Sequence, residues 1–187
     1  MTATKQLTDE HEGIKLMLGI LERVTSVAES GQKLDLEHIE RMLEFFRVFV
    51  DRCHHGKEED LLFPELEKHG ILKNGGPIGV MLSEHGQGRK YIQGMVDTLV
   101  GLRRGAPEAA TLFRQNAIGY ASLLRQHISK EEDVLFTMAD KVLSPQEDET
   151  LLQGFEKLEV ERIGVGKHEE FHKLLYKLQD IYLKNQL

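Results

Sequence analysis

The sequence predicts an all-α protein, an up-down-up-down antiparallel four-helix bundle followed by a C-terminal helical appendage. Three observations lead to this prediction. Apolar residues recur at helical spacing over four long stretches, short links with glycine and proline separate the stretches, and no stretch alternates with the two-residue period of a strand. Short links between long helices make consecutive helices antiparallel neighbours.

The first two expected helices are long and differ in how they end. The first covers about residues 8–29, with Thr8 or Asp9 as its N-cap. The second runs from about 35 to at least 63, where Pro64 should kink or end it, because proline lacks the backbone N–H that a helix needs. We expect these two helices to form the first hairpin of the bundle.

The next two expected helices repeat this arrangement after a glycine-rich link. The third covers about residues 78–104, and the fourth runs from Pro107, which suits a first helical turn, to about Val142. Ser144 and Pro145 open a further helical run, and an amphipathic helix over 167–183 closes the chain.

The chain therefore divides into a bundle and an extension. The bundle is expected over residues 1–143, with similar hairpins at 7–69 and 78–142, and the helical extension over 144–187 packs on it. A length of 187 residues suits one domain with a sizeable core plus such an appendage.

Composition narrows the class of protein. The formal net charge of −7 disfavours nucleic acid as a partner, because phosphate binding needs a basic face. No stretch approaches the roughly 20 apolar residues that span a bilayer, and no apolar signal segment opens the chain. Cys53 is the single cysteine, which excludes a disulfide framework and a cysteine zinc site. We expect a cytoplasmic protein without a membrane or nucleic-acid partner.

The nine histidines carry most of the functional information, because several of them occur in a repeated motif. His54 to Phe63 and His127 to Phe136 align without a gap as H-x-x-x-E-E-D-[LV]-L-F. A four-residue step turns a helix about 40° past one full turn, so each histidine shares a face with the first glutamate of its motif, Glu58 or Glu131. Apolar neighbours indicate that this face is the inward one.

Each hairpin also has a single histidine in its first helix. His11 follows Glu10, and His85 follows Glu84. His11 precedes His54 by 43 residues, and His85 precedes its partner in the second hairpin by 42. The chain thus resembles two copies of one hairpin, whose antiparallel helices can bring all four positions together at one end of the core.

Buried carboxylates are costly unless they pair with cations or coordinate metal. Imidazole suits iron, zinc and copper, and a carboxylate can bridge two cations. The six matching positions of the two hairpins therefore predict a binuclear metal site, whose ligands we list in chain order: His11, His54, Glu58, His85, His127 and Glu131.

On these motifs the chain resembles the hemerythrin-like, or HHE cation-binding, family from about Leu7 to Val142. The resemblance implies a non-haem centre of two iron ions per chain, bridged by Glu58 and Glu131, with zinc or another divalent metal as a substitute in purified protein. It also implies work with oxygen, nitric oxide, redox state or iron itself.

Two positions differ from the oxygen-carrying members of that family. Those proteins have a second histidine four residues after the one in the third helix, where this chain has Arg89. They also have a histidine and an aspartate five apart in the fourth helix, whereas His127 and Glu131 are four apart. Both differences count against reversible oxygen carriage.

Three further side chains are candidates for the metal site. His168 could return from the appendage to supply the donor that Arg89 cannot, with His172 as a weaker candidate on the same helix face. His55 is an alternative to His54, although its face would run through polar residues. Tyr120 lies seven residues before His127 and could approach the metal or a bound ligand.

The leading hypothesis is a di-iron protein that senses or binds oxygen, nitric oxide or oxidants, or that stores or handles iron. One alternative is a di-iron enzyme that acts on peroxide or nitric oxide, or an iron-sulfur repair factor. The other is an interaction bundle without metal. A small molecule is the expected ligand, and the sequence identifies no protein partner.

Overall fold

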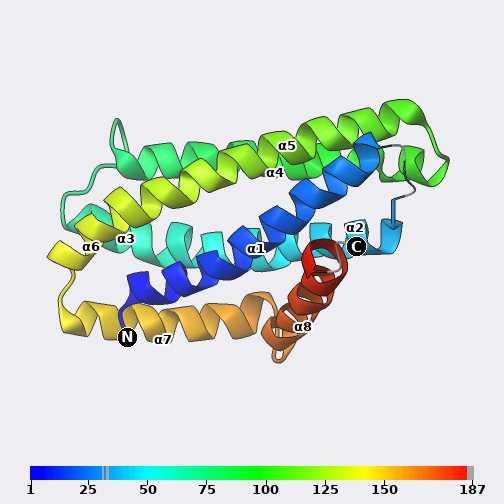
Figure 1. The fold of residues 1–187 in the computed structure, drawn as a ribbon. Coiled ribbons are helices and arrows are strands. Elements are labelled where there is room, and N and C mark those ends of the chain that lie inside the picture. The colour runs from blue at the N-terminus through cyan, green and yellow to red at the C-terminus, as the bar shows by residue number, and fades with distance from the viewer. Residues whose placement is uncertain (31, 33, 185–187) are drawn as a thin grey trace.

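A computed structural model describes residues 1–30, 32 and 34–184, and these residues are helical with short links and no strand. Long helical segments lie side by side along one axis, and one helix crosses them (Figure 1). Before the C-terminal extension the chain forms the following segments: α1 (Ala3–Glu29), α2 (Leu36–Phe45), η1 (Phe46–His55), η2 (Glu58–Leu62), α3 (Phe63–Lys68), α4 (Pro77–Arg103), α5 (Pro107–Lys130), η3 (Glu131–Leu135) and α6 (Phe136–Val142). The expectation of an all-α bundle is confirmed.

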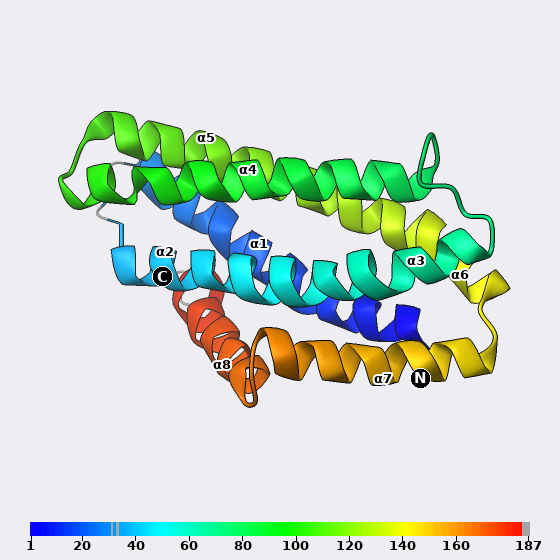
Figure 2. The same cartoon turned by 180° about the vertical axis from the view of Figure 1, so that it is seen from behind.

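Each long segment begins and ends where local chemistry favours it. Pro77 and Pro107 occupy the first turns of α4 and α5, where the missing N–H costs no helical hydrogen bond. Gly105 follows α4 with φ of 70°, the left-handed conformation that glycine adopts without steric cost. Seen from both sides, α1 and α4 run in one direction along the bundle, and the continuous runs from α2 to α3 and from α5 to α6 run in the other (Figures 1 and 2).

The first helix starts earlier than the sequence indicated. Its N-cap is Thr2, whose hydroxyl accepts from the Lys5 backbone N–H, and neither Thr8 nor Asp9 caps it. The additional turn buries Ala3 and Leu7 completely. This apolar burial outweighs the capping preference of Thr8 and Asp9, since each buried side chain of this kind contributes about 1–3 kcal/mol.

Three of the segments that bear the histidine and glutamate motifs are π-helical: η1, η2 and η3. A π-helical turn holds i→i+5 hydrogen bonds and is wider than an α-helical one. Pro64 follows η2 and does not end the helix, which continues through α3. The π-helical turns η2 and η3 occupy equivalent positions, E-E-D-[LV]-L, in the two hairpins.

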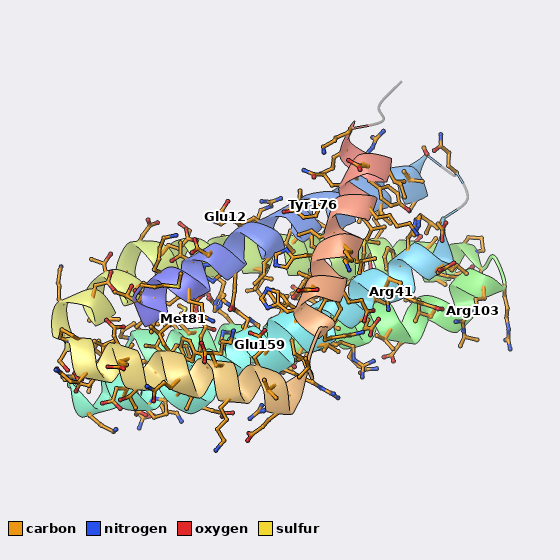
Figure 3. All side chains as sticks on the ribbon, turned by 90° about the horizontal axis from the view of Figure 1, so that it is seen from below. Glu12, Arg41, Met81, Arg103, Glu159 and Tyr176 are labelled. Atoms are coloured by element: carbon orange, nitrogen blue, oxygen red, sulfur yellow. The ribbon has the colours of Figure 1, made fainter. Side chains whose placement is uncertain are left out.

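The C-terminal extension consists of α7 (Pro145–Arg162), α8 (Lys167–Gln179) and η4 (Asp180–Lys184). Ser144 and Glu147 form a capping box at the start of α7. Gly164 and Gly166 both have positive φ and turn the chain between α7 and α8. Helix α8 then lies across α1 and α2 (Figure 3).

The apolar core has two parts with a polar layer between them. One part includes Ile14, Val50, Ile92 and Leu124, together with the buried face of α8. The other includes the following residues of the same long segments: Leu7, Leu62, Met81 and Leu135. The buried histidines and glutamates lie between these positions on every segment, so the polar layer is closed off from solvent at both ends.

Candidate metal centre

Seven buried side chains with metal-ligating atoms meet in this polar layer. Their exposed fractions lie between 0% and 4%. Their donor atoms form two groups, each within 4.8 Å: His11, His54, Glu58 and Glu131 in one, and His55, Glu58, His85 and His127 in the other. All six residues expected from the sequence motifs are in the groups, and His55 is the seventh.

Both glutamates lie between the two hairpins. Glu131 approaches the Nε2 atoms of His11 at 3.3 Å and His127 at 3.2 Å. Glu58 approaches the Nε2 atoms of His54 at 3.6 Å and His85 at 3.5 Å. Each carboxylate therefore has one histidine of each hairpin beside it, which is the placement that a group bridging two cations requires.

The polar atoms at the centre of the layer lack partners within the described chain. Both carboxylate oxygens of Glu58 and of Glu131, and Nε2 of His11, are buried without a hydrogen bond. A buried carboxylate without a hydrogen bond or counter-charge is strongly unfavourable, since desolvation costs several kcal/mol. Cations between these atoms would satisfy them, so the donor set fits a metal centre.

Burial shifts the ionisation of Glu58 and His54, whereas Glu131 and His127 shift each other's pKa in the direction that favours their charged forms, against the effect of burial. Burial, followed by repulsion from Glu131, raises the pKa of Glu58 well above its usual range. Burial lowers the pKa of His54 to about 4 although Glu10 partly opposes this effect, so the imidazole is neutral at pH 7. A neutral imidazole is the form that ligates metal.

Four of the histidines are oriented by a second carboxylate. The Nδ1 atoms of His11, His54, His85 and His127 lie within hydrogen-bonding distance of four glutamates that the sequence analysis left without a role. The pairs are His11 with Glu132 at 2.9 Å, His54 with Glu10 at 2.8 Å, His85 with Glu59 at 2.7 Å and His127 with Glu84 at 3.0 Å. An Nδ1–H donated to a carboxylate fixes the tautomer, so Nε2 presents its lone pair to the centre.

Each of these carboxylates is in turn held by a cation. The pairs are Glu132 with Lys15 at 2.9 Å, Glu10 with Lys57 at 2.6 Å, Glu59 with Arg89 at 2.6 Å, and Glu84 with Lys130. Arg89 therefore has a definite place: it does not ligate, but it neutralises the carboxylate that orients His85. This completes four sets of histidine, glutamate and cation around the centre.

The four sets follow a pseudo-twofold relation between the hairpins. His11 takes its glutamate from the second hairpin, and His85 takes its glutamate from the first. His54 and His127 each take the glutamate of their own hairpin. The duplicated sequence motif thus has duplicated hydrogen bonds. The sequence signal for the orienting glutamates was their position next to His11, Glu58, His85 and Glu131.

The relation breaks at one ligand position, where the first hairpin has His55 and the second has Ile128. His55 stacks on His85 with ring centroids 3.8 Å apart, and its Nδ1 is buried without a hydrogen bond. One group thus has three histidines and the other two. His55 is thus placed to offer the donor that Arg89 cannot, and it lies in the layer together with His54 and not in its place.

The sequence did not predict that His54 and His55 both face the core, because the prediction assumed α-helical geometry. Both His54 and His55 belong to η1, whose π-helical turns rotate less per residue than an α-helix. Adjacent residues can then both face the core, and the exposed fractions are 1% for His54 and 4% for His55.

The remaining candidates lie outside the two groups. His168 was expected to reach the metal, but its Nδ1 lies 2.9 Å from Glu159 and its Nε2 lies 2.9 Å from His172. Helix α8 crosses the bundle beyond the buried layer, so neither histidine of α8 is among the donors. Tyr120 is also outside the donor groups and packs edge-on against Phe46, with ring centroids 4.9 Å apart.

Comparisons with known proteins agree with this geometry. Residues 2–139 match the family model described as the hemerythrin HHE cation binding domain. Uncharacterized proteins of Mycobacterium bovis and Mycobacterium tuberculosis are each 23% identical over 181 residues, which covers 97% of this chain and 69% of the relative. No solved structure gives a significant match.

The match covers the four segments that carry the motifs, and its cation-binding description agrees with the buried donors. Among the residues that the structure describes, no helix is long and apolar enough to cross a membrane. The chain belongs to the hemerythrin HHE cation-binding domain family.

Proposed function

We propose that the buried layer holds two iron ions, one in each donor group, with Glu58 and Glu131 as bridges. The observation that carries this proposal is the set of four carboxylate oxygens that are buried without a hydrogen bond. Two divalent ions would offset the two carboxylates, and imidazoles with carboxylates suit iron. An iron pair held by these residues would supply one-electron redox chemistry and could bind a small ligand.

The ligand in this proposal is oxygen, nitric oxide or peroxide. A pocket of about 220 Å³ is lined by His55, Gly88, Tyr120 and Arg89, and we propose it as the path by which a ligand reaches the centre. Arg89 is paired with Asp51 at 2.7 Å. The pocket is large enough for a molecule of a few atoms.

The proposed role is binding or sensing of that ligand, or the handling of iron. A di-iron enzyme that turns over peroxide or nitric oxide would use the same donors. Repeated consumption of the ligand indicates the enzyme, whereas a spectral change that saturates at stoichiometric ligand indicates the binder. A bundle without metal is the remaining alternative, and metal analysis separates it from both.

The decisive experiment is metal analysis, with optical and Mössbauer spectroscopy, of protein produced with adequate iron and purified without oxygen. We expect about two iron ions per chain, which is one for each donor group. Less than half an equivalent of any transition metal would contradict the proposal.

The access pocket can be tested with a matched pair of glycine variants on α4. A Cβ at Gly88 lies 3.5 Å from the Tyr120 ring in the pocket, whereas a Cβ at Gly86 has no neighbour within 4 Å. Gly88→Val should slow azide binding to the iron-loaded protein several-fold, and Gly86→Val should not. Equal rates in the two variants would mean that ligands reach the metal by another path.

A further inference from the structure

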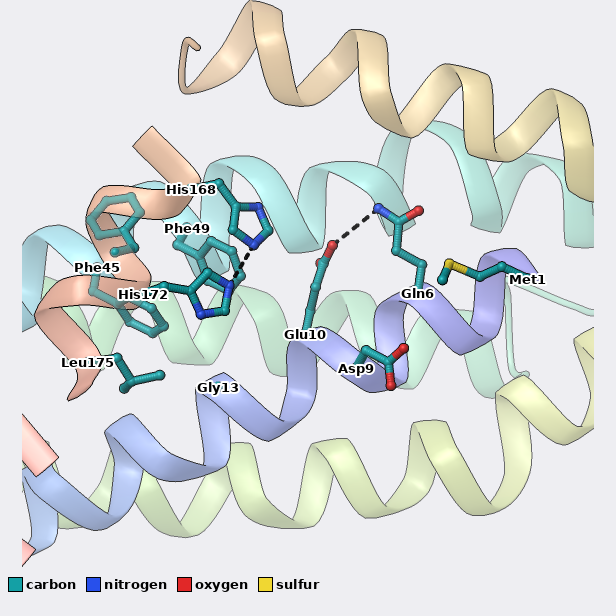
Figure 4. A pocket seen from close by; sticks show the side chains of 11 residues that line it. Met1, Gln6, Asp9, Glu10, Gly13, Phe45, Phe49, His168, His172 and Leu175 are labelled. Carbon is teal, nitrogen blue, oxygen red and sulfur yellow. Dashed lines mark hydrogen bonds between the residues drawn. The ribbon is translucent and has the colours of Figure 1, made fainter. Parts of the chain in front are cut away.

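The two histidines of α8 that the buried centre does not use line a second pocket. It has a volume of about 260 Å³ and lies between α1, the α2–η1 segment and α8. Phe45, Phe49 and Leu175 form apolar parts of its wall, and His168 and His172 lie beside one another facing Glu10 across it (Figure 4).

The geometry of this histidine pair is that of a chelate. His168 and His172 are four residues apart on one helix face, and their rings are stacked with centroids 4.8 Å apart. Their Nε2 atoms approach to 2.9 Å. Two imidazoles that converge on one point through Nε2 can share a single ion.

One member of the pair is oriented in the same way as the buried ligands. Nδ1 of His168 lies 2.9 Å from Oε1 of Glu159, which can accept its proton. A carboxylate at Nδ1 leaves the Nε2 lone pair for a metal and increases its basicity. A simple surface histidine pair would not need this third residue.

The pair is linked to the buried centre by hydrogen bonds. The second oxygen of Glu159 accepts from Lys57 at 3.0 Å, and Lys57 donates to Glu10 at 2.6 Å. The other oxygen of Glu10 lies 2.8 Å from Nδ1 of His54. Glu10 therefore has one side on the pocket and the other on a ligand of the centre.

The pair of histidines on α8 is accessible to solvent, whereas the buried centre is not. The His168 side chain is 32% exposed, whereas His54 and Glu58 are 1% and 0% exposed. An ion that enters the centre has to be taken from solvent at some outer position. The pocket offers two imidazoles for this step and a carboxylate on its inner side.

We propose that His168 and His172 form a separate, solvent-accessible capture site for a divalent transition-metal ion, from which the buried centre is loaded. The loading step rests on the proposed function, but the capture site does not. Imidazole pairs bind Cu²⁺, Ni²⁺ and Zn²⁺ more tightly than Fe²⁺. Copper is therefore the sensitive probe of the site, and ferrous iron is the probe of loading.

The capture site is tested by adding one equivalent of Cu²⁺ to the iron-loaded full-length protein and recording its EPR spectrum. We expect hyperfine coupling to two imidazole nitrogens. His168→Ala and His172→Ala should each remove this signal and weaken copper binding by about tenfold or more, since a single donor lacks the chelate effect. His38→Ala is the matched control, because His38 also has a carboxylate, Asp35, near its Nδ1 and belongs to none of the groups of possible metal ligands in the described residues.

The loading step is tested by stopped-flow uptake of Fe²⁺ into protein freed of metal. His168→Ala and His172→Ala should slow uptake several-fold and leave the final iron content unchanged, whereas His38→Ala should match the wild type. A wild-type copper spectrum in either α8 variant would overturn the capture site. Unchanged uptake rates would overturn its loading role.

The two proposals fail in different ways. If wild type takes no iron into the buried layer, the proposed function fails, and the copper spectrum still decides the surface pair. Both α8 variants replace residues that are partly exposed, so circular dichroism should show the wild-type helical content.

Discussion

At the scale of single residues, the metal centre depends on groups that do not ligate. Glu10, Glu59, Glu84 and Glu132 hold the Nδ1 atoms of four of the candidate ligand histidines, and each of these glutamates is held by a lysine or arginine. The cation stabilises the carboxylate, which in turn selects the histidine tautomer. Metal affinity should therefore respond to residues outside the donor groups.

Glu10→Gln tests this dependence with little change in shape. The amide is uncharged and has one acceptor oxygen where the carboxylate has two, so it cannot accept hydrogen bonds from both His54 and Lys57. The tautomer of His54 is then held less firmly. We expect metal affinity to fall by about 10- to 100-fold, measured by competition with a chromophoric chelator. Glu12→Gln, at an exposed position of the same helix, is the control, and equal affinities in the two variants would argue against this role.

Cys53 shows how burial suppresses reactivity next to the centre. The side chain is 0% exposed, and burial raises the pKa of its thiol to about 12. At pH 8 only about one thiol in ten thousand would then be ionised, against about a quarter for an exposed cysteine. The thiolate is the reactive form, so reactivity should stay low until the pH nears that raised value.

Intact-mass analysis after iodoacetamide treatment at pH 8 checks this prediction. The folded protein should remain unmodified over the time in which guanidinium-unfolded protein is fully alkylated. Rapid labelling of the folded protein would show that the segment around Cys53 opens readily.

At the scale of elements, the π-helical turns of η1 and the packing of α8 shape the polar layer and the core next to it. The turns of η1 direct His54 and His55 inward together. Helix α8 covers the part of the core next to this layer, where Phe171 is 1% exposed and meets Phe45 at a centroid distance of 5.6 Å. The extension is thus a part of the packed core and not a loose appendage.

Phe171→Ala measures how much this packing stabilises the protein. Removal of a buried phenylalanine leaves a cavity and should lower the free energy of unfolding by about 3–5 kcal/mol. Tyr176→Ala on the same helix removes a side chain of a residue that is 58% exposed and should change it by less than about 0.5 kcal/mol. Guanidinium titration followed by circular dichroism gives both values, and similar losses would mean that α8 contributes little.

At the scale of the whole molecule, the two hairpins meet at Glu58 and Glu131. Each of these carboxylates lies beside a histidine from each hairpin, so ions bound there would connect the hairpins. Binding to the folded state alone stabilises it by mass action. Folding and metal binding should therefore be coupled.

Metal should accordingly raise the melting temperature. At a free metal concentration about 1,000 times the dissociation constant, one site adds about 4 kcal/mol, which raises Tm by about 10 °C in a protein of this size. Glu58→Ala and Glu131→Ala should abolish most of this gain. Without metal, the Glu58→Ala variant should be no less stable than wild type, because a buried carboxylate without a hydrogen bond has been removed.

Differential scanning calorimetry of the metal-free and metal-loaded forms measures both effects. A wild-type Tm that does not change with metal would rule out the coupling between the hairpins.

The sequence by itself determined the fold class and the ligand types. Helical periodicity is a local property, and the repeated H-x-x-x-E with a single histidine before it identified His11, His54, Glu58, His85, His127 and Glu131 as candidate ligands, all of which the structure brings together. Such a motif can be recognised in the sequence because a four-residue step places both side chains on one helical face.

Only the tertiary structure decided which histidine completes the set. His55 faces the layer because η1 is π-helical, and no local pattern in the sequence indicated that wider turn. His168 instead faces a separate pocket, because the turn at Gly164 and Gly166 sends α8 across the bundle. Only the tertiary structure likewise revealed the role of the four orienting glutamates. Each stands beside a motif residue in the sequence, but the histidine that it contacts lies on another helix. The distance between the two side chains is therefore set by how the helices pack.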